Sequence, residues 1–181
     1  MNNIDPFMER VLELQKELTD IKINHWINEE LFSPLWWLQL VLFILPWVIW
    51  WKLADKKRIT DILAFGLLVL IVSTLFDRMG NELLFWAYPV KLIPLFPSLL
   101  SFDFAGLPVA YMLIYQYCPK WTQFIIANIL ASAAYSFVVE PAIIKLGFYQ
   151  IYKWKFIYSF PIYILIAASL KGLLEYIKSR K

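Results

Sequence analysis

The chain has 181 residues and a formal net charge of +3, and 61% of its residues are apolar, with a mean hydropathy of +0.60. Soluble domains hold roughly 45 to 50% apolar residues, so this composition excludes an ordinary soluble fold. With roughly 20 apolar residues needed for each spanning helix, the chain has room for about five spans. No basic face rises above what membrane topology requires, so we expect no nucleic-acid partner.

Cysteine and histidine are each present once, as Cys118 and His25. A single thiol forms neither an intramolecular disulfide nor a cysteine metal cage, and a single imidazole excludes clustered-histidine sites. We therefore expect no metal site and no cofactor. The start of the chain lacks the basic region and the uninterrupted apolar run of a cleaved signal peptide, so membrane entry is expected through the first internal span.

Residues 1–30 predict an amphipathic amino-terminal helix that precedes a transmembrane bundle at residues 31–181. Asp5 is a suitable N-cap, and Pro6 suits the first helical position, where its missing N–H costs nothing. Apolar residues then recur at spacings of four and three, as a seam formed by Phe7, Val11, Leu14, Leu18 and Ile21. This seam must face the bilayer interface, the rest of the protein, or another copy or membrane partner. We expect the helix to be ordered and docked, because the seam would otherwise leave apolar area wet.

Five apolar segments predict an all-α polytopic membrane helix bundle. Residues 31–51 form the clearest segment, with tryptophans at both ends, as indoles prefer the two membrane interfaces. The other four segments cover residues 59–76, 102–118, 121–140 and 156–177. Residues 83–100 are apolar enough to suggest a sixth span, but they hold Lys91 and three prolines. We interpret them, and residues 142–153, as outer segments that lie on the membrane or re-enter it.

The densest basic cluster follows the first span, at residues 52–58, and the acidic tail precedes it with seven acids against three bases. Short cytoplasmic loops carry an excess of Lys and Arg. The sequence therefore predicts an external amino terminus and a cytoplasmic carboxyl terminus.

Several short features along residues 35–120 occur together in one known family. They are Trp51 with Asp55–Arg58, Asp77, Trp86-Ala-Tyr88-Pro89, Pro94, Asp103 with Pro108, and Tyr115-Gln116. In these features the chain resembles an uncharacterised family of small multi-pass membrane proteins of spore-forming bacilli and clostridia. The resemblance implies a bacterial plasma-membrane setting and carries no catalytic residues with it.

Acidic residues at one membrane depth form the candidate site. Alternating topology places Asp77, Asp103 and Glu140 near the outer face, together with Arg78 and Glu82. Asp103 begins the third predicted helix, where it could simply cap free N–H groups. Asp77 and Glu140 are expected at carboxyl ends of helices, where the helix dipole opposes a negative charge. We expect these two acids to share one outward-facing polar site, with Arg78 as the competing source of neutralisation.

A polar stripe in the fourth predicted helix supports this site. Asn128, Ser132, Ser136 and Glu140 recur every four residues, with Tyr135 beside them. Tyr111 offers a phenol from the third predicted helix. Amides and hydroxyls facing lipid would lack partners, so the stripe must pack against helices or line a cavity. Both interpretations stay open.

Three functions are compatible with these patterns. An outward-facing carboxylate pocket would suit small-molecule or cation binding or transport. A buried, protonated Asp77 or Glu140 could act as the general acid of an intramembrane enzyme on a lipid or isoprenoid. The chain could also be a structural or assembly subunit that recruits partners through the amino-terminal seam.

Overall fold

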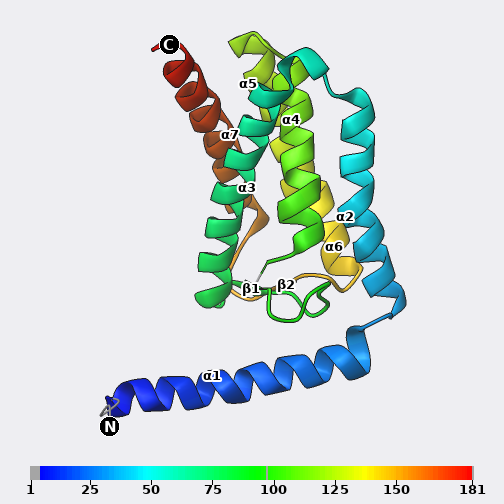
Figure 1. The fold of residues 1–181 in the computed structure, drawn as a ribbon, viewed down its shortest axis with the longest axis vertical. Coiled ribbons are helices and arrows are strands. Elements are labelled where there is room, and N and C mark those ends of the chain that lie inside the picture. Colours follow the sequence, from blue (N-terminus) through cyan, green and yellow to red (C-terminus); the bar gives the residue numbers. More distant parts are fainter. Residues whose placement is uncertain (1–4, 97, 181) are drawn as a thin grey trace.

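The computed structural model describes residues 5–96 and 98–180 and confirms an all-α bundle (Figure 1). Four helical segments are long and apolar enough, by length and composition, to cross a membrane, which supports an integral membrane protein. They are Pro34–Leu53, Lys56–Glu82, Trp121–Lys145 and Phe156–Lys178. A shorter helix lies between them in the bundle. The helices are α1 (Pro6–His25), α2 (Pro34–Leu53), α3 (Ile59–Glu82), α4 (Leu107–Tyr117), α5 (Trp121–Ala134), α6 (Glu140–Lys145) and α7 (Phe156–Lys178).

Three π-helical turns interrupt this pattern, at Trp26–Glu30, Phe102–Gly106 and Tyr135–Val139. The second turn leads into α4, and Pro108 explains one of its open carbonyls. Proline has no N–H, so the carbonyl of Phe104, four residues earlier, lacks its helical donor. The indole of Trp47 on α2 replaces that donor at 3.0 Å. A side chain of α2 thus satisfies the irregular start of α4.

The apolar core fills the half of the bundle near the α2–α3 connection. Phe65 stacks on Tyr115 with ring centroids 4.5 Å apart, and Phe124 meets Phe65 edge-on at 6.0 Å. Gly66 is required where α3 meets α4, because a Cβ there would lie 2.4 Å from the sulfur of Met112. Stacked rings and close packing fix this half, and the opposite half carries the polar residues discussed below.

Residues 83–100 are not a sixth helical span. Trp86–Ala87 (β1) pairs antiparallel with Gln150–Ile151 (β2), so the two segments interpreted as outer ones form a short ribbon at one end of the bundle. The backbone of residues 90–92 is held by the start of α2 and the turn before it. Glu30 accepts the N–H of Lys91 at 2.7 Å, while Gln39 donates to the Val90 carbonyl at 2.6 Å. This end is therefore an ordered cap on the bundle.

Helix α1 begins as predicted, since the Asp5 carboxylate accepts the N–H of Phe7 at 3.0 Å. Of the three surfaces left open for its seam, the rest of this protein is excluded, because none of the residues of α1 is buried. The helix lies crosswise to the bundle, beyond the end that carries the ribbon (Figure 1). The seam residues Phe7, Val11, Leu14, Leu18 and Ile21 are all exposed. The seam was long enough to predict a binding face but carried no information on which surface it binds.

Candidate functional site

Asp77 lies on the buried face of α3, which also carries Gly66 and Ser73. Its Oδ1 accepts the indole N–H of Trp86 at 2.9 Å and the hydroxyl of Tyr88. Its Oδ2 is buried without a hydrogen-bond partner. Burial raises the pKa of Tyr88 well above its ordinary value, and the charges of Asp77 and Asp103 raise it further. Tyr88 is therefore a neutral phenol that donates to Asp77.

Gly80, one turn after Asp77, makes the approach of Trp86 possible. A Cβ at this position would lie 2.1 Å from the nearest indole carbon of Trp86. No side chain larger than hydrogen fits there without moving the ring. The glycine therefore allows the ribbon to reach across the end of α3 and place its indole on the carboxylate.

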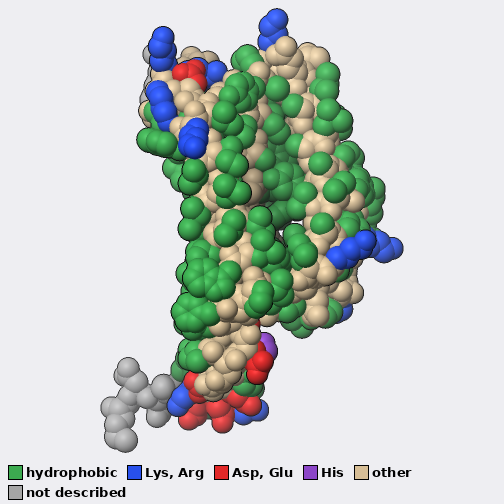
Figure 2. Space-filling view, turned by 90° about the vertical axis from the view of Figure 1, so that its right-hand side faces the viewer, with side chains coloured by type: hydrophobic (Ala, Val, Ile, Leu, Met, Phe, Trp, Pro, Cys, Tyr) green, Lys and Arg blue, Asp and Glu red, His purple; other side chains and the backbone are tan. Residues whose placement is uncertain are grey.

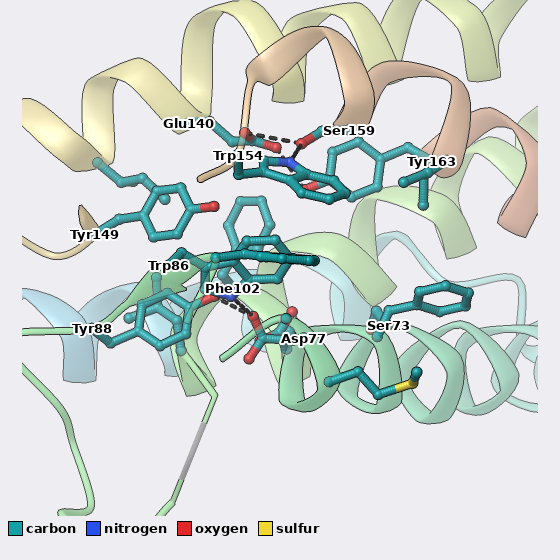
Figure 3. A pocket seen from close by; sticks show the side chains of 18 of the residues that line it. Ser73, Asp77, Trp86, Tyr88, Phe102, Glu140, Tyr149, Trp154, Ser159 and Tyr163 are labelled. Atoms are coloured by element: carbon teal, nitrogen blue, oxygen red, sulfur yellow. Dashed lines mark hydrogen bonds between the residues drawn. The ribbon is translucent and has the colours of Figure 1, made fainter. Parts of the chain in front are cut away.

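Glu140 occupies the opposite wall of the same site (Figure 3). It accepts hydrogen bonds from the Tyr163 hydroxyl at 2.8 Å and from the Ser159 hydroxyl at 3.2 Å, both from α7. The indole of Trp154 donates in turn to the Ser159 oxygen at 2.9 Å. Each carboxylate is thus linked to a tryptophan indole. Asp77 binds Trp86 directly, whereas Glu140 is linked to Trp154 through Ser159.

Aromatic rings separate the two acids. The indoles of Trp86 and Trp154 meet edge-on with centroids 5.0 Å apart, and Tyr88 stacks on Tyr149 at 5.5 Å. Burial raises the pKa of Tyr149, and the charges of Glu140, Asp77 and Asp103 raise it further. This phenol therefore lies within electrostatic range of all three acids.

A cavity of about 280 Å³ lies between these walls. Three carboxyl groups line it, and all are buried, with exposed fractions of 7% for Asp77, 5% for Asp103 and 3% for Glu140. Oδ2 of Asp103 is, like that of Asp77, buried without a partner. Among the described residues that line the cavity there is no Lys, Arg or His. The aromatic part of the wall comprises Phe85, Trp86, Tyr88, Phe102, Tyr149, Trp154 and Tyr163, with Phe76 at its edge.

The structure brings three of the ten predicted candidates to this cavity, Asp77, Asp103 and Glu140. Arg78 and Glu82 do not reach it. They form an exposed pair with each other at 3.3 Å, with side chains 58% and 65% exposed. The competing interpretation, in which Arg78 neutralises the site, is therefore excluded. Lys91, beyond the cavity wall, is the base whose charge acts on Asp77.

The helix-dipole argument for Asp77 and Glu140 is wrong. Helix α3 continues to Glu82, and the helical segment of Glu140 continues to Lys145, so neither Asp77 nor Glu140 ends a helix. The residues after each acid were interpreted as lying outside the helices, although residues 78–82 and 141–145 extend them by more than a turn. Asp103 lies in the first turn of its helical segment, within the π-helical turn Phe102–Gly106, where the dipole favours an anion.

The other candidates do not line the cavity and lie between the helices beside it. The hydroxyl oxygens of Tyr111 and Ser132 are 3.1 Å apart, and Ser132 donates to the Asn128 amide oxygen at 3.2 Å. Tyr135 donates to the Gly106 carbonyl at 2.8 Å. Ser136 is fully buried, with no partner for its hydroxyl. For Tyr111, Asn128, Ser132 and Tyr135 the packing interpretation fits, since these contacts join helices to one another.

A π-helical turn keeps the predicted stripe on one face. In a straight helix of about 3.6 residues per turn, positions four apart drift steadily around the axis. The turn Tyr135–Val139 inserts one extra residue into the repeat, which offsets this drift. All four residues of the stripe are buried: Asn128, Ser132, Ser136 and Glu140. Both ends of the stripe contact α7, since Asn128 donates to the Ile164 carbonyl at 3.0 Å and Glu140 accepts from Tyr163.

Five residues that make hydrogen bonds in the site were not among the predicted candidates: Trp86, Tyr88, Trp154, Ser159 and Tyr163. Neither was Tyr149, which stacks on Tyr88. Trp86 and Tyr88 stood among the features that carry the family resemblance, but nothing indicated their partners. The decisive contact is the pairing of Trp86 with Ile151 in the ribbon. Two-residue strands leave no alternating pattern for the sequence to show.

The acids of the cavity do not form a metal site. No group of three or more His, Cys, Asp or Glu within residues 5–96 and 98–180 is placed to hold one ion. Asp77 and Glu140 are held on opposite walls by rings and hydroxyls, so their oxygens do not converge on a point. The geometry suits a larger, diffuse positive group that contacts rings and carboxylates together.

Comparisons with protein-family models, with curated proteins and with solved structures found no match. The chemistry of the cavity is therefore the basis for a function.

Proposed function

We propose that this protein binds an organic cation of the ammonium type in the cavity between α3, α7 and the ribbon. The main support is the composition of the cavity. Three buried carboxyl groups and several aromatic rings line it, and none of its lining residues in the described part of the chain is basic. A buried carboxylate without a counter-charge is costly. A bound ammonium would supply that charge.

The aromatic rings support a cation rather than a neutral polar ligand. Ammonium groups are attracted to the faces of Trp and Tyr, by more than about 2 kcal/mol when the contact is desolvated. Trp86, Tyr88 and Trp154 are held in fixed orientation by hydrogen bonds and by each other. Rings that are already ordered lose little entropy when a ligand binds. The cavity of about 280 Å³ is just below the range of about 300 to 1,000 Å³ of drug-sized sites, which favours a small head group.

The setting we propose is the bacterial plasma membrane, with the amino terminus outside and the cavity near the outer face. The support is the distribution of bases. The α2–α3 connection, the α4–α5 connection and the end of α7 lie at the end opposite the cavity (Figure 1). Figure 2 shows basic side chains gathered at that end and acidic ones on α1 at the other. By the positive-inside tendency the basic end is cytoplasmic.

The proposal is tested with purified protein in lipid nanodiscs. The probe is a small quaternary ammonium compound of the size of choline. Isothermal calorimetry should show binding of the cation and not of its neutral carbon isostere. Asp77→Asn should weaken binding roughly thirtyfold or more, the lower end for one partner of a buried charge pair. Glu82→Gln is the matched control on the same helix, because Glu82 is exposed and faces away from the cavity.

Two results would contradict the proposal. Equal binding of cation and isostere would remove the role of charge. Unchanged affinity in both Asp77→Asn and Glu140→Gln would remove the role of the carboxyl groups.

A further inference from the structure

One wall of the cavity continues onto the outer surface of the bundle. Phe76, Met79 and Leu83 line the cavity and are also 51%, 61% and 57% exposed. They follow one another at spacings of three and four on α3, so they form a continuous strip on one face. Ile162 and Ile166 of α7 line the cavity across from this strip. An apolar passage therefore connects the buried carboxyl groups with the exposed flank between α3 and α7.

The exposed flank is the part of the surface that lies against lipid. It belongs to two of the helical segments that are long and apolar enough to span a membrane. Its neighbours on the surface are also large and apolar, with Leu75 58% and Leu165 64% exposed. Figure 2 shows hydrophobic side chains along the length of the bundle and charged ones near its ends. A molecule that leaves the cavity here enters hydrocarbon and not water.

The end of the bundle facing the ribbon is more firmly closed. The Phe85 carbonyl accepts the backbone N–H groups of Tyr152 and Lys153 at 2.9 and 3.2 Å. The rings of Phe85 and Trp154 stack at 5.6 Å across the same place. Access from water would require these bonds and the stack to open, whereas the passage between α3 and α7 is lined only by flexible apolar side chains.

We infer that the natural ligand is a membrane amphiphile: an amine or quaternary ammonium head sits among the carboxyl groups, and its hydrocarbon chain leaves between α3 and α7. This inference rests on the proposed cation site and adds the ligand class and its route. The head group meets Asp77, Asp103 and Glu140, which are buried. The chain replaces lipid against Met79 and Leu83. A purely water-soluble cation would make no use of this apolar strip.

The test compares two probes on the full-length protein in phosphatidylcholine nanodiscs. One is the choline-sized head alone, and the other is a single-chain alkyl trimethylammonium with a diazirine midway along its chain. Irradiation followed by mass spectrometry should place adducts on α3 between Phe76 and Leu83 and on α7 near Ile162. Excess unlabelled long-chain cation should compete these adducts away, and a long-chain alcohol should not.

A bulky residue placed in the passage distinguishes the contribution of the hydrocarbon chain to binding from that of the head group. Met79→Trp should weaken binding of the long-chain cation about tenfold more than it weakens binding of the head-only probe. Leu67→Trp is the matched control, because Leu67 is also exposed on α3, at 53%, but lies about three turns from Met79 and does not line the cavity. It should change neither probe.

The outcomes distinguish this inference from the proposed function. Failure of the head-only probe to bind wild type overturns the proposed function. Head-only binding together with adducts spread evenly over α2, α3 and α7, unaffected by competitor, overturns the passage alone. An equal effect of Met79→Trp on both probes also overturns it, since the substitution would then act on the head site.

Discussion

Gly80→Ala tests the geometry on which the site depends. The added Cβ would lie 2.1 Å from Trp86, and the two next nearest atoms, at 2.2 and 2.7 Å, belong to the same indole. The ring cannot simply turn aside. Its N–H binds Asp77 at 2.9 Å, and Trp154 meets it edge-on at 5.0 Å. The methyl group must therefore displace the indole and break its bond to the carboxylate.

The magnitude follows from three opposing effects. Replacing glycine by alanine inside a helix favours the folded state by about 1 kcal/mol. Overpacking costs about 1 to 3 kcal/mol, and loss of a hydrogen bond to a charged group costs about 1.5 to 3 kcal/mol. The net expectation is a loss of roughly 1.5 to 5 kcal/mol, from the same principles.

The control for this prediction is Gly172→Ala on α7. A Cβ at Gly172 meets its nearest neighbour, Trp121, at 3.8 Å, which is ordinary contact. Only the helix-propensity effect remains, so this variant should match or exceed wild type. Thermal unfolding in one detergent, with tryptophan fluorescence as the signal, compares the three proteins. If Gly80→Ala is as stable as Gly172→Ala, the close approach of Trp86 to α3 is wrong.

Three further predictions concern the ends of the chain and the cap. Burial raises the pKa of Glu30 above its ordinary value of 4.5. The stability that this shift contributes is therefore full below pH 4.5 and is lost as the pH rises through the folded-state pKa. Glu30→Gln should flatten this decline of the thermal midpoint with pH, and an unchanged pH profile would contradict the prediction. In a cysteine-free background, an impermeant thiol reagent on intact cells should label a cysteine at Asp5 and not one at Ser179; the reverse pattern would invert the topology. A spin label at Leu14 should be shielded from an aqueous relaxation agent and reached by oxygen, and one at Lys16 the opposite, if α1 lies in the bilayer interface; shielding of Leu14 from both would indicate a second copy instead.

The sequence predicted those features that follow a regular repeat. The four-residue spacing from Asn128 to Glu140 predicted a stripe that is buried, and Asp5 with Pro6 marked the start of α1 correctly. Such features depend on residues near one another in the chain, so local rules suffice.

The features that it could not predict depend on irregular backbone or distant pairing. The π-helical turn Tyr135–Val139 keeps Glu140 in line with the stripe that begins at Asn128, and no residue in that turn signals the extra position. The pairing of Trp86 with Ile151 joins positions 65 residues apart through two-residue strands. Most of the aromatic wall of the cavity depends on that one pairing.

Asp77 allows the packing and binding interpretations to be separated by the sign of a stability change. A carboxylate kept for structure stabilises the protein by holding Trp86 and Tyr88, and removing its charge weakens hydrogen bonds that are worth about 1.5 to 3 kcal/mol each. A carboxylate kept for a ligand has no basic side chain beside it in the cavity lining until the ligand binds, and its buried, unpartnered Oδ2 makes the empty site costly. Asparagine retains Oδ1 as the acceptor for both donors and removes the charge. We therefore expect Asp77→Asn to raise the thermal midpoint of the ligand-free protein while it weakens ammonium binding, as substitutions in functional sites often trade activity for stability.

Glu82→Gln should leave both quantities within error, since exposed positions rarely change stability by more than about 0.5 kcal/mol. A lowered midpoint in Asp77→Asn with ammonium binding intact would assign the carboxylate to holding the ribbon, and the cavity would then lose its strongest claim to a ligand.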